Sequence, residues 1–93
     1  MTIAIIFHEV QDGDVWARAW RKGPQSRHEM FGKIGVKCRN FRDPDNPNSA
    51  GLLLEIPDMA QFQELLQSDE GQKAMREDGL KAETMRMLVE FTP

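Results

Sequence analysis

The sequence has a single cysteine, Cys38, and no long run of apolar residues. One cysteine cannot form an internal disulfide, and Cys38 has no CxxC partner with which to hold zinc. Nothing in the surrounding sequence would activate its thiol, so we interpret Cys38 as a small core residue. Because no signal peptide and no apolar stretch of membrane-spanning length is found, we expect a cytoplasmic protein that does not associate with a membrane.

Basic residues are also too few to form the positive stripe that is typical of nucleic-acid-binding proteins. The 93 residues include 12 Lys and Arg against 15 Asp and Glu, and the two signs are interspersed. There is no glycine-rich phosphate loop, and the two histidines, His8 and His28, have no third ligand at a fixed spacing. We therefore expect no nucleic-acid partner and no metal or other cofactor. A chain of this length predicts one domain, residues 1–93, whose modest core an oligomer would enlarge.

The clearest local pattern is a β-hairpin around a polar turn. Residues 43–48 contain two prolines among Asp and Asn residues, which predicts a turn. The apolar run 52–56 predicts a buried strand that ends at Pro57, and Asp58 can cap the helix that follows. The turn lacks the ligand spacing and the terminal glutamate of an EF-hand, which argues against a calcium loop.

Further strands and two interrupted helical segments surround this hairpin. Strands are predicted over residues 2–10, 36–41 and 84–91. The first helical segment starts near Asp14, is interrupted at Gly23-Pro24 and resumes over 26–33. The second covers 59–78, with a bend expected at Ser68. The order βαββαβ predicts an α+β, ferredoxin-like fold: a four-stranded antiparallel sheet in the order 4-1-3-2, with two helices on one face.

Alternation along the predicted strands gives the sheet two unlike faces. The almost wholly apolar set is predicted to pack on the helices: Ile3, Ile5, Phe7, Leu52, Leu54, Ile56, Met85, Met87, Val89 and Phe91. The other set mixes apolar and ionisable side chains: Ala4, Ile6, His8, Val10, Lys37, Arg39, Phe41, Leu53, Glu55, Thr84, Arg86, Leu88 and Glu90. Such a mixed patch is typical of an interface or a binding surface, and we predict that it forms a homodimer.

Three segments together have a familiar pattern: the hairpin segment FRDPDNPNSAGLLLEIPD, the helical segment MAQFQELLQSDEGQKAMREDGL and the closing strand. Over about residues 27–91 the chain resembles small proteins of the dimeric α/β-barrel superfamily, and the antibiotic-biosynthesis-monooxygenase-like and related stand-alone domains look similar. The resemblance implies that two protomers pack sheet against sheet. It also implies that a pocket lies in the barrel, or between each sheet and its helices.

The functional residues of that superfamily match this chain at one position. Haem-degrading members use a first-strand asparagine, a tryptophan in the later half and a histidine on the second helix, and all three are absent here. Polyketide-cyclase members pair a first-strand histidine, which His8 matches, with a tyrosine and a second histidine. This chain has no tyrosine and no histidine after His28. The resemblance therefore implies the fold more strongly than any one activity.

His8 is the candidate catalytic base, because histidine accepts a proton near neutral pH and His8 is the only histidine in a predicted strand. By alternation, Glu55, Glu90 and Arg86 share its face, where they could orient the ring and stabilise an anionic oxygen. The alternative is a histidine that only satisfies an interface network. Arg86, like Arg39, is also a candidate for binding a ligand oxygen, or for pairing with the two glutamates across strands.

Trp16 and Trp20 lie one helical turn apart and could wall a pocket for an aromatic ligand, or could simply pack in the core. Two functions remain open. One is a small cofactor-independent oxygenase, isomerase or cyclase acting on an aromatic or carbonyl compound; the other is a non-catalytic dimeric module that binds a ligand or a protein. An RNA-binding domain of the same topology is excluded because strand 52–56 lacks stacking aromatics. An acylphosphatase is excluded because the turn over 11–14 is acidic.

Overall fold

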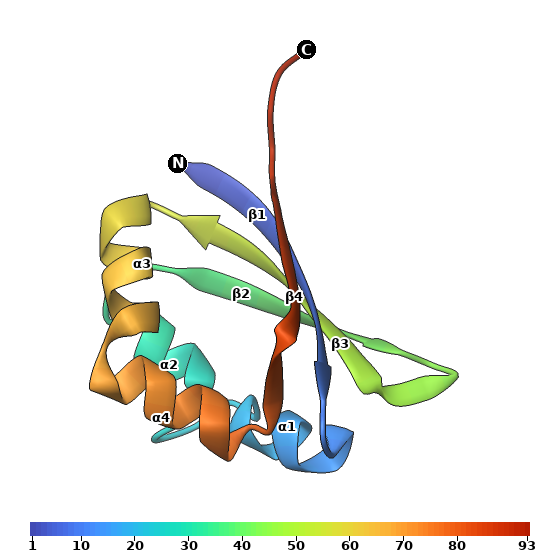
Figure 1. The fold of residues 1–93 in the computed structure, drawn as a ribbon. Helices are drawn as coiled ribbons and strands as arrows, with labels where there is room; N and C mark the ends of the chain where they lie inside the picture. The colour runs from blue at the N-terminus through green and yellow to red at the C-terminus, as the bar shows by residue number, and fades with distance from the viewer.

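The computed structural model describes residues 1–93 as four strands and four short helices (Figure 1). Their bounds are β1 Thr2–Val10, α1 Gly13–Ala19, α2 Arg27–Gly32, β2 Lys37–Asp43, β3 Asn46–Ile56, α3 Met59–Gln67, α4 Asp69–Glu77 and β4 Leu80–Val89. The strands form one antiparallel sheet in the order β2-β3-β1-β4, and the helices lie on one side of it. This confirms the predicted ferredoxin-like order. No helix is long and apolar enough to span a membrane.

Both interruptions of the helical segments are where the sequence predicts them. The first segment consists of α1 and α2, and the connection around Gly23 separates them. The second is divided at Ser68, whose hydroxyl donates to the Leu65 carbonyl at 2.6 Å and accepts from the Gly71 amide at 3.1 Å. One side chain thus ends α3 and caps α4, because it satisfies backbone groups that both helix ends leave unpaired.

The hairpin turn is shorter than predicted. It comprises only Pro44 and Asp45, and β3 already begins at Asn46, so the prediction of a turn over 43–48 was too long. Side chains hold this longer hairpin in place. The Asn48 carboxamide oxygen accepts from the Gly13 amide at 2.8 Å, and Arg42 donates to the Pro47 carbonyl at 2.8 Å. The Asn48 contact docks the hairpin on the start of α1, and the Arg42 contact ties its two strands together.

The last strand also begins earlier than predicted, at Leu80 rather than Thr84. The pairing of β4 with β1 shifts register between Phe7 and Glu9, as in a β-bulge. There the Thr84 hydroxyl accepts from the Glu9 amide at 2.9 Å. A bulge interrupts strict alternation, which explains why the sequence pattern did not extend back to Leu80.

The sheet faces are as predicted for β2, β3 and β4, but the prediction for β1 was wrong by one residue. Ile6 pairs with Leu52 and Met87, so the even-numbered residues of β1 lie on the helix side. Ala4, Ile6, His8 and Val10 are accordingly buried, whereas Ile5 and Phe7 are exposed on the other side. Both alternating sets of β1 are largely apolar, so alternation alone could not choose between them, and a slip of one residue exchanges the faces.

The core lies between the helices and the inner sides of β1 and β3. Aromatic rings continue it into the helical layer, with Phe31 stacked on Trp20 at 5.7 Å between ring centroids and tilted against Phe62 at 5.9 Å. Edge strand β4 is poorly covered, and Met85 and Met87 are exposed although their side of the sheet is the helix side. The core is therefore closed over β1 and β3 and open along β4.

Candidate active site

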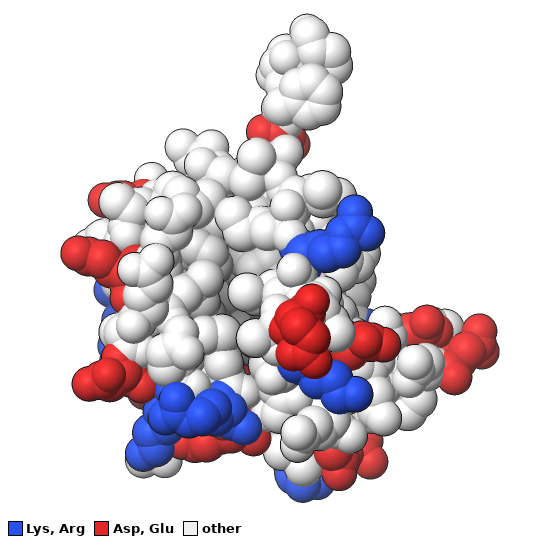
Figure 2. Space-filling model, in the orientation of Figure 1, with Lys and Arg blue, Asp and Glu red and all other residues white.

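A cavity of about 50 Å³ lies in this core, walled by β1, β3, β4 and all four helices. Most of its wall is apolar, and the ionisable side chains in it are His8, Arg27 and Asp78. Figure 2 shows this side of the molecule hollowed between α3–α4 and β4, with uncharged atoms lining the hollow and charged residues around it. A concave apolar site with a few polar groups is the usual form of a small-molecule site.

His8 is the most unusual group in this wall. Its side chain is only 5% exposed, and neither ring nitrogen has a hydrogen-bond partner in the protein. Burial lowers the pKa of His8, because the charged imidazolium loses its hydration. The ring is positioned by an edge-on contact with Trp16, at 5.8 Å between ring centroids. His8 is thus a neutral imidazole with one free donor and one free acceptor.

The two tryptophans both line the cavity, as the sequence suggested, and both are also part of the core. Their ring centroids are 6.2 Å apart, and Trp20 additionally makes a T-shaped contact with His28 at 5.1 Å. The indole nitrogen of Trp20 is fully enclosed and has no acceptor in the protein. The wall therefore contains three buried, unpaired polar atoms: two on His8 and one on Trp20.

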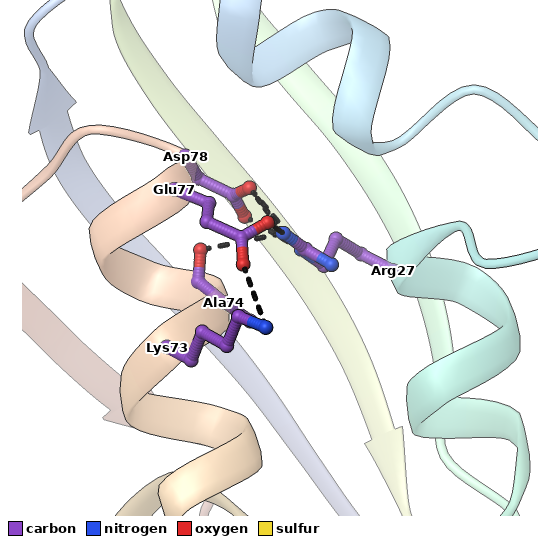
Figure 3. Close-up of polar contacts among 5 residues, drawn as sticks. All are labelled: Arg27, Lys73, Ala74, Glu77 and Asp78. Carbon is purple, nitrogen blue, oxygen red and sulfur yellow. Dashed lines mark hydrogen bonds and ion pairs between the residues drawn. The ribbon is translucent and has the colours of Figure 1, made fainter.

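The remaining charged groups of the wall form an ion pair between the start of α2 and the end of α4 (Figure 3). The Arg27 guanidinium contacts both carboxylate oxygens of Asp78 at 2.9 to 3.1 Å and also reaches the Ala74 carbonyl and the Glu77 carboxylate. The hydrogen bonds to Asp78 raise the pKa of Arg27. Burial raises the pKa of Asp78, and its contacts with Arg27 oppose that rise. The hydrogen bonds from Arg27 thus favour the ionised carboxylate of Asp78, and burial disfavours it.

The sequence interpretation missed Arg27 and Asp78, although a signal was present. Asp78 follows the buried Ala74 by four residues, and Arg27 precedes Met30 and Phe31 by three and four. Residues at these spacings share a helix face, so each charge continues an apolar stripe. Opposite charges on the buried stripes of two helices indicate a buried ion pair.

The predicted neighbours of His8 are on the other side of the sheet. Glu55 and Arg86 lie on the face turned away from the helices, and Glu90 follows the end of β4. The prediction that these residues orient His8 was therefore wrong. It followed from the one-residue error in β1, which had placed His8 on their face of the sheet. The expected pairing of Arg39 and Arg86 with the glutamates is not seen within one chain.

Arg39 and Cys38, the other two residues considered from the sequence, both lie away from the cavity wall. The Arg39 guanidinium lies 5.8 Å from the centre of the Phe41 ring, a cation–π contact on the outer face of the sheet. Burial raises the pKa of the Cys38 thiol to about 12, so Cys38 is an inert, partly buried residue, as its sequence context suggested. No group of three or more His, Cys, Asp or Glu side chains is placed to hold a metal ion.

No family model and no curated protein sequence matches this chain. Its fold is similar to that of an antibiotic biosynthesis monooxygenase, with 12% identity over 100% of this chain and 99% of the other and a TM-score of 0.71. A Nitrosomonas europaea protein assigned as an antibiotic biosynthesis monooxygenase has 13% identity over 99% and 98% of the two chains, with a TM-score of 0.69. An EthD family protein from Bacillus halodurans C-125 has 13% identity over both whole chains and a TM-score of 0.52. The chain thus shares the fold of these proteins, the ferredoxin-like α+β fold that its sequence predicted.

Proposed function

We propose that this protein is a small cofactor-independent enzyme, an oxygenase, isomerase or cyclase, that binds a small aromatic or carbonyl compound in the cavity. His8 is its catalytic base. The observation that carries the proposal is a buried histidine with two unpaired ring nitrogens in an apolar cavity. Leaving such atoms unpaired is costly for folding, so the site is better suited to a ligand than to stability alone.

The chemistry follows from the neutral state of His8. Its basic nitrogen accepts a proton from an acidic O–H or C–H of the substrate, and the bonding electrons remain on the substrate as a phenolate or enolate. The imidazolium and this anion form together, so each compensates the other's charge in a medium of low dielectric constant. The anion can be reprotonated elsewhere, attack a carbonyl, or give electrons to dioxygen as a co-substrate, which are the three reaction types proposed.

The size of the cavity restricts the substrate. An apolar cavity that binds benzene measures about 150 Å³, and this cavity measures about 50 Å³. Binding of an aromatic ring therefore requires the wall to move. Met30, Met75 and Met85 line the cavity, and flexible methionine side chains can repack around a ligand. Met85 is exposed on poorly covered β4, and this edge is the proposed access route.

The homodimer is part of the same proposal. We define the open face as the side of the sheet turned away from the helices, where Ile5, Phe7, Phe41, Leu53 and Leu88 lie. All but Leu53 are among the exposed large hydrophobic residues. An apolar patch of this kind is typical of a protein interface. Proteins with this fold are typically dimeric, and packing the open faces of two copies would close a barrel.

A non-catalytic module is the second candidate, and the small volume of the cavity favours it. In that case the dimer would be the functional form, and His8 and the tryptophans would only hold a ligand. The two candidates differ in whether a compound that binds is also converted.

A screen of small phenols, quinols and enolisable ketones, with and without dioxygen, tests for conversion. For any compound that is turned over, His8→Gln should lower the rate roughly 10²–10⁴-fold, because glutamine keeps hydrogen bonding but cannot accept the proton. His28→Gln is the matched control: His28 contacts Trp20 from outside the cavity wall, and its loss should leave turnover nearly unchanged. Retained turnover in His8→Gln would mean that the base lies elsewhere.

A further inference from the structure

We infer that Trp20 is a ligand-binding residue, whose indole N–H donates a hydrogen bond to an acceptor oxygen of the ligand. The ligand is then an uncharged aromatic compound with a carbonyl-type oxygen at a different position from the proton that His8 removes. This inference rests on the proposed function in that it uses the same cavity. It does not depend on whether the bound compound is converted.

The indole nitrogen of Trp20 is a donor without an acceptor. The residue is 6% exposed, its nitrogen is completely enclosed, and no protein acceptor lies within hydrogen-bond distance. A tryptophan N–H cannot act as an acceptor, so only an acceptor atom can satisfy it. Buried tryptophan usually finds such a partner.

Two acceptors of the cavity wall already accept hydrogen bonds from Arg27, and the free ring nitrogen of His8 does not lie within hydrogen-bond distance of the Trp20 indole. Asp78 and the Ala74 carbonyl both lie in the wall, and both accept hydrogen bonds from Arg27. The Trp20 ring is fixed between Phe31, stacked at 5.7 Å, and Trp16 at 6.2 Å. With the ring packed in this way and no protein acceptor in reach of its nitrogen, a molecule in the cavity is the partner that we infer for the indole N–H.

The charge of the wall determines the kind of molecule. Arg27 and Asp78 neutralise each other, and burial favours neutral His8. A ligand with a carboxylate or an ammonium group would lose its hydration and find no free counter-charge. An uncharged ligand loses less hydration free energy when it enters the cavity. Trp16 contacts both other rings, at 5.8 Å from His8 and 6.2 Å from Trp20 between ring centroids, so aromatic surface lies beside both polar groups.

Acetophenone and α-methylstyrene form a matched pair of probes, because the two molecules are similar in size and differ only in the replacement of the carbonyl oxygen by CH₂. In ¹H–¹⁵N spectra of the wild-type protein, the Trp20 indole resonance should move with acetophenone and should move much less with α-methylstyrene. The chain has two tryptophans, so Trp16→Phe leaves one indole resonance and assigns it. Trp16 also lines the cavity, but its nitrogen is not among the enclosed, unpaired atoms, so its indole resonance should respond similarly to both probes.

Trp20→Phe keeps an aromatic ring against Phe31 and removes the donor. The wild-type protein should prefer acetophenone to α-methylstyrene by a ratio that falls about tenfold in Trp20→Phe, as expected for one hydrogen bond. Trp16→Phe alters the same cavity and is expected to weaken the binding of both probes, but it removes no unpaired donor and should keep the ratio between them. His8→Gln should keep this ratio while it lowers turnover roughly 10²–10⁴-fold, so failure of the proposed catalysis and failure of this inference give different results.

Two results would overturn the inference. One is an indole resonance of Trp20 that responds equally to both probes, or to neither. The other is a folded Trp20→Phe protein that keeps the wild-type ratio, which would make Trp20 a packing residue against His28 and Phe31. If Trp20→Phe does not fold, the wild-type spectra decide alone.

Discussion

The two sides of the sheet carry the same kinds of residues under opposite conditions. On the cavity side, apolar residues of β1 and β3 are buried together with His8, and the only charges near them form the Arg27–Asp78 pair. On the open face, apolar side chains and charges alternate in solvent, and no ion pair joins them. A polar group costs little on the open face and much in the cavity. On the cavity side, buried polar groups therefore point to a ligand-binding or catalytic site. On the open face, exposed apolar groups point to a protein interface.

Two neighbouring leucines of β3 test this comparison most strongly. Leu54 is completely buried on the cavity side, and Leu53 points to the open face. Leu54→Glu should prevent folding, because it places an unpaired carboxylate in the core. Leu53→Glu should leave the secondary structure intact and abolish the proposed dimer. Circular dichroism and sedimentation velocity at micromolar concentration measure the two effects.

The reverse pattern, with Leu53→Glu unfolded and Leu54→Glu folded, would mean that the faces of β3 are exchanged. A wild-type protein that sediments as a monomer would remove the proposed role of the open face. Leu53→Ala is the control for lost apolar area without added charge.

The buried ion pair gives the next largest effect. Arg27→Met leaves Asp78 buried without its partner, and we expect a loss of about 3–5 kcal/mol in the free energy of unfolding. Arg39→Met, on the open face, should change it by less than about 0.5 kcal/mol. Urea denaturation measures both values.

The double variant Arg27→Met/Asp78→Leu distinguishes loss of a pair from loss of packing. Replacing both charges by apolar groups of similar size should recover most of the stability. A double variant as unstable as Arg27→Met would show that the aliphatic part of Arg27, rather than the unpaired carboxylate of Asp78, explains the loss.

The smallest effect is in the pH dependence of stability. In the unfolded chain His8 has its ordinary pKa of 6.5, and burial lowers that pKa in the folded state. Below 6.5 the unfolded chain therefore binds more protons than the folded one, so the free energy of unfolding falls with falling pH until the folded pKa is passed. His8→Gln lacks this contribution and should have a flatter profile.

The quantity to measure is the difference in the free energy of unfolding between wild type and His8→Gln at each pH. The raised pKa of Asp78 changes stability in the opposite direction, but it is common to both proteins and cancels in this difference. A difference that does not change between about pH 7.5 and about pH 5 would mean that His8 is solvated in the folded protein.

The sequence by itself determined the order of the elements and the points at which the last two helices begin. Asp58 and Ser68 cap α3 and α4 as predicted, and Ser26 caps α2 by accepting from the Glu29 amide, because these signals act over three or four residues. The apolar run of β3 was assigned to the correct face, since its alternation with Glu55 leaves one apolar side. Local chemistry was sufficient for these features.

Only the tertiary structure decided which side of β1 is buried and which charges lie beside His8. Both sides of β1 are apolar, so its register depends on hydrogen bonds to β3 and β4, which are far away in the sequence. Arg27 and Asp78 are 51 residues apart, and each alone looks like an ordinary helix residue. His8 was predicted as the base, but its cavity, its tryptophan neighbours and its lack of a carboxylate partner follow from how the helices pack on the sheet. Burial and pairing are properties of the whole fold, because they depend on which distant surfaces exclude water from a residue.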